Sequence, residues 1–214
     1  VAPGDRGLVQ APKCAEMVML YAATLQAGAV FLPLNTAYTR DELAYFVGNA
    51  SPALIVCAPA AEDEIVALAE PGNAKVLTLD QDGTGTLAIA AEAKPEQFDT
   101  VARNPDDLAA LLYTSGTTGR SKGAMLTHGN LVSNTQSLVT AWEMSADDLL
   151  VHALPIFHTH GLFVALNAAL MVGMRVNFMP GFDAEKILAA LPRATLMMGV
   201  PTFYTRLLAD ELFV

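Results

Sequence analysis

The chain has 214 residues, of which 53% are hydrophobic and 16% are charged. Its formal net charge of −10 argues against a nucleic-acid or anionic-membrane surface, because such a surface needs basic side chains to neutralise phosphate. Two mostly apolar stretches are excluded as membrane spans: residues 17–34 contain Gln26, Gly28 and Pro33, and residues 161–174 are too short.

The first part of the chain alternates between strand and helix patterns. Short apolar runs predict strands at residues 7–10, 30–34, 54–57 and 76–79. Helices are predicted between them, at residues 14–27, 39–49 and 61–69. Gly28 is expected to end the first helix, and Thr39 with Glu42 forms a capping box that begins the second.

The pattern changes between Asp80 and Asp107. Turn-forming residues at 82–85 and a polar stretch at 94–104 interrupt the alternation. We therefore predict three regions: a first α/β subdomain portion at 1–82, a linker or surface excursion at 83–107, and a second α/β subdomain portion at 108–214.

The alternation resumes at Leu108. Strands are predicted at residues 108–112, 124–127, 149–152, 175–178 and 195–198. Helices are predicted at residues 130–141, 161–172 and 183–190, and from Pro201 onward. This alternation predicts the α/β class, with largely parallel sheets and helices on both faces.

Residues 113–123, Tyr-Thr-Ser-Gly-Thr-Thr-Gly-Arg-Ser-Lys-Gly, are the most informative stretch of the chain. Glycines let a backbone turn tightly and approach a ligand closely, and hydroxyls and free N–H groups donate hydrogen bonds. A lysine adds a positive charge that suits phosphate. Because this stretch follows an apolar strand, it predicts a polyphosphate-binding loop in preference to a flexible linker. It is not the common nucleotide loop, in which Lys follows Gly and precedes Ser or Thr.

The same stretch resembles, almost residue for residue, the phosphate-binding signature of the acyl-adenylate-forming superfamily, which includes acyl-CoA synthetases, adenylation domains and luciferases. Ser121 stands where the usual form has proline. The resemblance implies that ATP phosphates are bound by one group of residues: Thr114, Ser115, Gly116, Thr117, Thr118, Gly119 and Lys122.

Residues 154–161, Leu-Pro-Ile-Phe-His-Thr-His-Gly, resemble the superfamily's acyl-pocket motif, and Gly199-Val200-Pro201-Thr202 resembles its next pocket segment. Upstream, Gly4-Asp5-Arg6, residues 27–30 and Pro33-Leu34-Asn35 also follow the family's order, so the resemblance spans nearly the whole chain. The double-histidine form is most similar to malonyl-CoA synthetases.

The resemblance implies that the acid lies beside His158, His160 and Gly199. His158 matches the family's pocket histidine, although a histidine next to Phe157 could equally be structural. His160 suits a small acid with a second polar group. A second carboxylate needs a partner when it is desolvated, and arginine offers a two-point grip. Arg206 is the first candidate and Arg175 the second, although either alone is more often a surface residue.

The reaction implied by the resemblance is a two-step ligation. Malonate and ATP would form an acyl-adenylate and diphosphate, and coenzyme A would then displace AMP to give malonyl-CoA, a precursor in fatty acid metabolism. Mg²⁺ is expected on the phosphates, and no protein metal site is predicted. The family's adenine-binding segment and catalytic lysine lie downstream of the motifs found here. We therefore expect an N-terminal-domain fragment that lacks its C-terminal domain, is inactive alone and has no assignable catalytic residue.

Two alternatives remain open. The intact protein could act on another short acid, such as acetate, propionate or methylmalonate, or it could be a non-catalytic nucleotide-binding module. Its partners are expected to be small molecules, with no nucleic acid and no membrane. Cys14 and Cys57 show neither metal-ligand spacing nor a disulfide framework, and the chain starts without a signal-peptide pattern, so the cytoplasm is the expected compartment.

Overall fold

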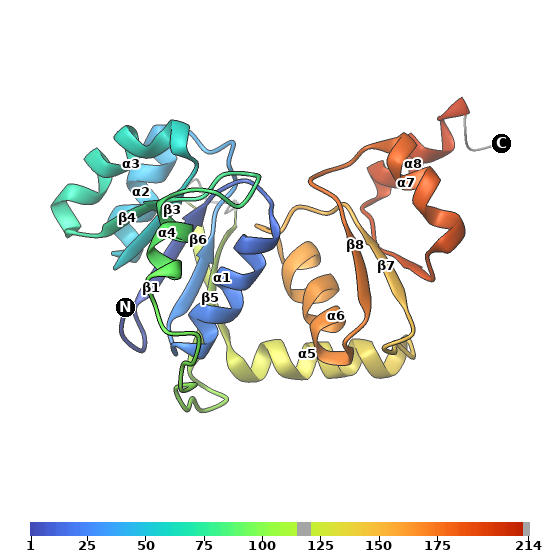
Figure 1. Ribbon diagram of the computed structural model, residues 1–214, viewed down its shortest axis with the longest axis horizontal. Coiled ribbons are helices and arrows are strands. Elements are labelled where there is room, and N and C mark those ends of the chain that lie inside the picture. The colour runs from blue at the N-terminus through green and yellow to red at the C-terminus, as the bar shows by residue number, and fades with distance from the viewer. Residues whose placement is uncertain (115–120, 212–214) are drawn as a thin grey trace. The chain divides into compact units, whose positions relative to one another are not determined.

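The computed structural model describes residues 1–114 and 121–211, shown in Figure 1. The chain divides into two compact units, Val1–Asn130 and Leu131–Val214. Each unit is built around its own sheet. No helix among the described residues is both long enough and apolar enough to cross a membrane.

The first unit contains a six-stranded sheet in the order β4-β3-β1-β2-β5-β6. Its strands are β1 (Arg6–Gln10), β2 (Val30–Pro33), β3 (Leu54–Cys57), β4 (Lys75–Thr78), β5 (Leu108–Thr114) and β6 (Lys122–Thr127). All neighbouring strands pair in parallel except β5 and β6, which form an antiparallel pair at the edge of the sheet.

Helices cover both faces of this sheet, as predicted. They are α1 (Ala15–Gln26), α2 (Arg40–Ala50), α3 (Glu62–Ala69) and α4 (Thr86–Glu92). Successive residues of a strand point to opposite faces. Accordingly, Phe31 of β2 packs edge-on against Tyr21 of α1, whereas Leu32 belongs to the cluster that β1 and β3 form with α2 and α3. Figure 1 shows α1 on the opposite side of the sheet from α2 and α3.

The predicted helix boundaries have the expected causes. Gly28 adopts a φ of +68° just after α1, a conformation that an L side chain rarely tolerates. Thr39 and Glu42 form the predicted capping box of α2, because the Glu42 carboxylate accepts from the Thr39 backbone N–H at 2.8 Å while the Thr39 hydroxyl accepts from the Glu42 N–H.

The second unit contains a three-stranded parallel sheet in the order β8-β7-β9. Its strands are β7 (Leu149–His152), β8 (Arg175–Phe178) and β9 (Leu196–Met197). The unit's helices are α6 (Asn167–Val172), α7 (Ala184–Ala190) and α8 (Pro201–Leu208), and α5 (His128–Ala141) begins in the first unit and continues into the second. Leu150 and Val151 of β7 belong to separate core clusters, which contain α6 on one side and α7 and α8 on the other.

The predicted boundary between the two α/β portions lies too early in the chain. β5 pairs with β2, so residues 108–127 complete the first sheet, and the division falls between Asn130 and Leu131. Apolar patterns identify a strand but do not show which sheet it joins. Residues 161–172 also differ from the single predicted helix, because His160–Leu166 form a π-helix before α6 begins.

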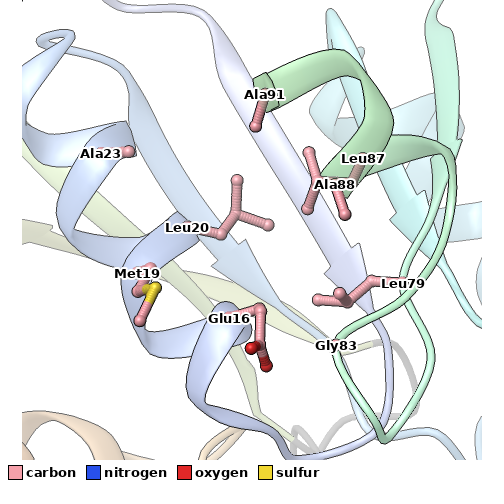
Figure 2. A pocket seen from close by; sticks show the side chains of 9 residues that line it. All are labelled: Glu16, Met19, Leu20, Ala23, Leu79, Gly83, Leu87, Ala88 and Ala91. Carbon is pink, nitrogen blue, oxygen red and sulfur yellow. The ribbon is translucent and has the colours of Figure 1, made fainter. Parts of the chain in front are cut away.

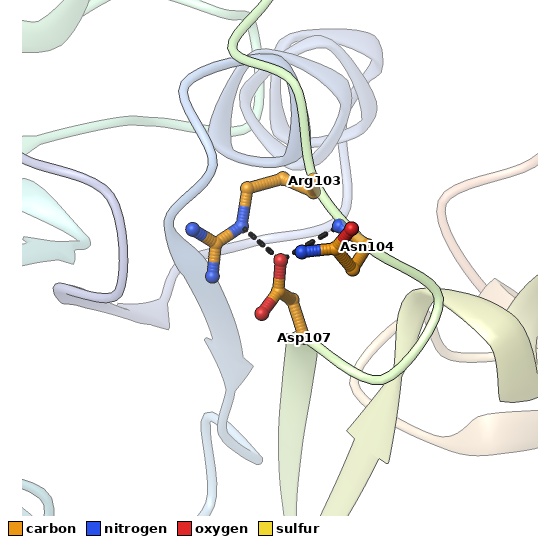
Figure 3. A network of polar contacts seen from close by, with 3 residues as sticks. All are labelled: Arg103, Asn104 and Asp107. Atoms are coloured by element: carbon orange, nitrogen blue, oxygen red, sulfur yellow. Dashed lines mark hydrogen bonds and ion pairs between the residues drawn. The ribbon is translucent and has the colours of Figure 1, made fainter.

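The predicted excursion at 83–107 is partly helical and is attached to the first unit. α4 lies within it, and the Thr86 hydroxyl accepts from the Thr78 backbone N–H at 2.8 Å. Farther along, Arg103 pairs with Asp107, with 3.3 Å between Nε and Oδ2, and the same carboxylate accepts from the Asn104 N–H (Figure 3). These contacts return the chain to the start of β5.

Candidate functional site

The described part of the predicted phosphate site lies where β5 ends and β6 begins. Thr114 is the last residue of β5, Lys122 is the first residue of β6, and the two are paired in the antiparallel register. Both are exposed. Because β5 runs parallel to β2, Thr114 lies at the carboxyl edge of the sheet, where ligands bind in open α/β folds. The predicted ligands Ser115, Gly116, Thr117, Thr118 and Gly119 lie outside the described residues.

An apolar groove elsewhere in the first unit does not suit phosphate. It lies between α1 and α4, has a volume of about 250 Å³, and is shown in Figure 2. Among the described residues, Glu16 is the only charged one that lines it, and its carboxylate would repel a polyphosphate. This groove is therefore not a candidate ATP site.

The predicted acyl-pocket segment follows the carboxyl end of β7. Leu154 and Ile156 are buried and fix the backbone, whereas the side chain of His158 is exposed. The rings of Phe157 and His158 lie 4.5 Å apart between centroids. The imidazole is nonetheless partly desolvated, which holds the pKa of His158 below its ordinary value and favours the neutral form at neutral pH.

His160 and Gly161 begin the π-helix, a type of helix that is rare and often occurs at functional sites. His160 is half-buried. Gly161 has a packing reason to be glycine, because an added Cβ would overlap the carbonyl oxygen of Pro155. This close approach brings together the backbone on the two sides of the segment that contains His158 and His160.

The structure places the two candidate arginines differently. Arg175 begins β8 and is paired with Leu149 at the amino edge of the sheet, whereas the segment that contains His158 and His160 follows the opposite, carboxyl edge. Arg206 lies on α8, which follows the carboxyl edge of β9 through Gly199, and its guanidinium lies over the ring of Phe182 at 4.0 Å. The topology thus separates Arg175 from the histidines and leaves Arg206 as the better candidate.

Gly199 is half-buried at the turn into α8. An added Cβ there would lie 3.2 Å from Cβ of Phe203, so a larger residue would crowd the first turn of the helix. Pro201 occupies the first turn, where its missing N–H costs nothing. In the described residues, no group of three or more His, Cys, Asp or Glu side chains could hold a metal ion.

A family model described as AMP-binding enzyme matches residues 1–213. The chain belongs to the AMP-binding enzyme family. The predicted membership of the adenylate-forming superfamily is therefore confirmed.

Solved and curated members of the family resemble the chain over almost its whole length. The ATP-bound MatB of Rhodopseudomonas palustris is 54% identical, with a TM-score of 0.97 over 99% of the chain. A feruloyl-CoA synthase of Amycolatopsis sp is 33% identical over 98% of the chain, and a malonate–CoA ligase of Mus musculus is 33% identical over 87%. The chain spans 42%, 41% and 32% of the lengths of these three proteins, respectively.

Two positions of the chain have contacts that its sequence did not predict. His152 is 1% exposed at the end of β7, its ring stacks on Phe178, and its Nε2 donates to the carbonyl oxygen of Gly161 at 2.9 Å. This bond ties the strand end to the π-helix. Tyr45 of α2 donates to the carbonyl oxygen of Ser121 at 2.9 Å. A strand-final histidine before a glycine-containing motif was an available signal for the first, but nothing in the local sequence indicates the second.

Proposed function

We propose that the intact protein is an ATP-dependent acid–CoA ligase that forms AMP and diphosphate, and that malonate is its acid. The match to ATP-bound MatB carries the proposal, because 54% identity over 99% of the chain includes both the phosphate and the acyl-pocket segments. The present chain supplies the N-terminal part of this enzyme. The remaining residues of the active site would come from the rest of the polypeptide.

In the proposed ligase, residues 114–122 bind the ATP phosphates. Lys122 offsets negative charge on the β- and γ-phosphates, and the Thr114 hydroxyl lies on the opposite strand of the same hairpin. Mg²⁺ would enter with the nucleotide, coordinated by phosphate oxygens. Phosphoryl and adenylyl transfer of this kind depends on positioning and charge stabilisation.

Neither cysteine in the chain suits a nucleophile. Cys14 and Cys57 are buried, and burial raises the pKa of both thiols, that of Cys57 to about 11. Both therefore remain protonated at neutral pH. Accordingly, the carboxylate of the acid substrate is the group that attacks the α-phosphorus in this proposal.

The proposed acid site pairs His160 with Arg206. Stacking over Phe182 uses the face of the guanidinium, so the N–H groups on its edge can still grip a carboxylate at two points. The reacting carboxylate of malonate goes to ATP and leaves its second carboxylate for this pair. Neutral His158 can then donate or accept one hydrogen bond without adding charge.

Other acids and a non-catalytic module are the competing functions. Relatives named feruloyl-CoA synthase and oxalate–CoA ligase are also similar to the chain, at 33% and 29% identity, so the acid is the part of the proposal that most needs a test. We also propose the cytoplasm as the compartment, which fractionation of the source cells would test.

The test uses the protein encoded by the complete reading frame. AMP and CoA-thioester formation are measured with ATP, Mg²⁺, CoA and a panel of malonate, methylmalonate, oxalate, acetate, propionate and ferulate. We expect the highest kcat/KM with malonate. Preference for another acid would overturn the substrate assignment, and ATP binding without AMP formation for any acid would favour the non-catalytic module.

A further inference from the structure

Helix α2 contacts the β5–β6 hairpin on both sides of the predicted phosphate ligands. Tyr45 and Asn49 are four residues apart and therefore lie on one face of the helix. The Tyr45 hydroxyl donates to the carbonyl oxygen of Ser121 at 2.9 Å, and Asn49 Oδ1 accepts from the Tyr113 hydroxyl. Ser121 directly precedes Lys122, and Tyr113 directly precedes Thr114. One helix face thus holds the residue before each described candidate ligand.

Aromatic packing makes this contact stiff. The ring of Tyr113 lies 4.4 Å from that of Phe46 and 6.2 Å from that of Tyr45, measured between centroids. Desolvation, and after it the proximity of Tyr45, raises the pKa of Tyr113, so its phenol stays protonated and donates at neutral pH. The ring of Tyr45 also lies 5.6 Å from that of Phe46, so its hydroxyl extends from a ring that has two aromatic neighbours, Phe46 and Tyr113.

The first half of β6 is held by its pairing with β5 and has little apolar support. β6 is an edge strand that pairs with β5, and its residues from Lys122 to Met125 are all exposed. Met125 keeps 66% of its surface exposed, so apolar burial contributes little at this end of the strand. Besides the pairing of Lys122 with Thr114, the hydrogen bond from Tyr45 to Ser121 is therefore a contact that can set where β6 begins.

We propose that Tyr45 is a positioning residue for ATP binding. Its hydrogen bond to the Ser121 carbonyl sets the position and direction of the backbone at Lys122. Because a lysine ammonium acts as a point charge at the end of a flexible side chain, its attraction for phosphate depends on where the Lys122 backbone lies. The Asn49–Tyr113 hydrogen bond holds the other strand of the hairpin, β5. This inference rests on the proposed function, in which Lys122 faces the phosphates of ATP.

The test compares two variants that each lose one phenolic hydroxyl. In the intact enzyme, Tyr45→Phe keeps the ring packing and removes the bond to Ser121. Loss of one hydrogen bond of ordinary strength predicts a rise of about three- to tenfold in KM for ATP, with KM for the acid and the melting temperature near those of the wild type. Tyr38→Phe is the matched control, since Tyr38 packs on Phe46 at 4.9 Å but its hydroxyl bonds nothing in the described part of the chain. It should behave as the wild type does.

A double variant sharpens the test. If Tyr45 acts through Lys122, then Tyr45→Phe should change ATP affinity by less than twofold when Lys122 is already alanine. Equal KM for ATP in Tyr45→Phe and Tyr38→Phe would overturn the inference. So would parallel losses for ATP and acid with a lowered melting temperature, which would show a general structural role.

Failure of the proposed function can be distinguished from failure of this inference. If the wild-type enzyme forms no AMP with any acid, the ligase assignment is lost, but calorimetric binding of ATP to the wild type, Tyr45→Phe and Tyr38→Phe still measures positioning. A selective loss of ATP affinity in Tyr45→Phe would support the inference, and equal affinities would overturn it.

Discussion

The two units hold their candidate ligand-binding segments by different means. In the first unit, Lys122 begins an exposed edge strand that is tethered by the hydroxyl of Tyr45. In the second, the His158–Gly161 segment is held by buried side chains, by the close backbone contact between Gly161 and Pro155, and by the buried ring of His152. A charged, flexible ligand such as a polyphosphate can be bound by a few polar contacts, whereas a small acid needs a pocket of defined shape. Substitutions in the two segments should therefore have different main effects: on ATP use in the first unit and on stability in the second.

Gly161→Ala should give the largest effect on stability. The added Cβ has no room beside the Pro155 carbonyl, so the backbone must shift, at a cost of about 3 kcal/mol in the free energy of unfolding. Urea denaturation of the intact protein measures it. Gly181→Ala is the control, because nothing lies within 4 Å of its added Cβ. A loss of less than 1 kcal/mol in Gly161→Ala would show that the pocket segment is not held by this contact.

Lys122→Ala should leave stability almost unchanged and weaken the use of ATP. Removing one charged hydrogen bond typically costs about 1.5–3 kcal/mol, or roughly ten- to a hundredfold in kcat/KM for ATP. Lys75→Ala is the matched control, because Lys75 is an exposed lysine that begins β4 at the amino edge of the same sheet. If both variants used ATP as well as the wild type does, the phosphate-site assignment would be lost.

Arg206→Gln should separate dicarboxylates from monocarboxylates. Loss of the guanidinium is expected to raise KM for malonate roughly tenfold and to change KM for propionate little, because only malonate carries a second carboxylate. Arg175→Gln, at the amino edge of the second sheet, should leave both values unchanged. Equal losses for the two acids in Arg206→Gln would remove the proposed pairing.

The smallest expected effect is on the pH dependence of stability, and it can be compared for one histidine from each unit. Desolvation lowers the pKa of His158 and of His128, and Arg103 lowers that of His128 further. The folded protein thus binds these protons more weakly than the unfolded chain does. The corresponding stability is present above the unfolded value of about 6.5 and is lost as the pH falls below it.

Urea denaturation at pH 5.5, 6.5 and 7.5 measures this dependence. His158→Gln and His128→Gln should each flatten it slightly, because each removes a group that the unfolded chain protonates preferentially. A steeper dependence of stability on pH in either variant would show that folding raises the pKa of that histidine, in contradiction to the prediction.

Much of the fold was predictable from local patterns. The apolar runs at 7–10, 30–34, 54–57 and 149–152 are strands within a residue or two, and Gly28 and Thr39 act as helix boundaries for the expected reasons. Such features depend on residues close together in sequence. The motif at 113–123 likewise identified the family, which the match over residues 1–213 confirms.

Tertiary structure decided what local patterns leave open. The sequence of the strand at 108–114 does not indicate which sheet it joins. Its pairing with β2 places it in the first unit, which extends to residue 130. Arg175 and Arg206 look alike in sequence, but strand direction puts Arg175 at the amino edge of its sheet, whereas Arg206 follows the carboxyl edge of β9 and stacks on Phe182. Tyr45 and Ser121 are 76 positions apart, and only the packing of α2 against β5 joins them. The sequence by itself determined the elements and the chemistry of the motifs, because these arise from neighbouring residues. The tertiary structure alone determined which side chains support those motifs, because such contacts depend on strand order and direction.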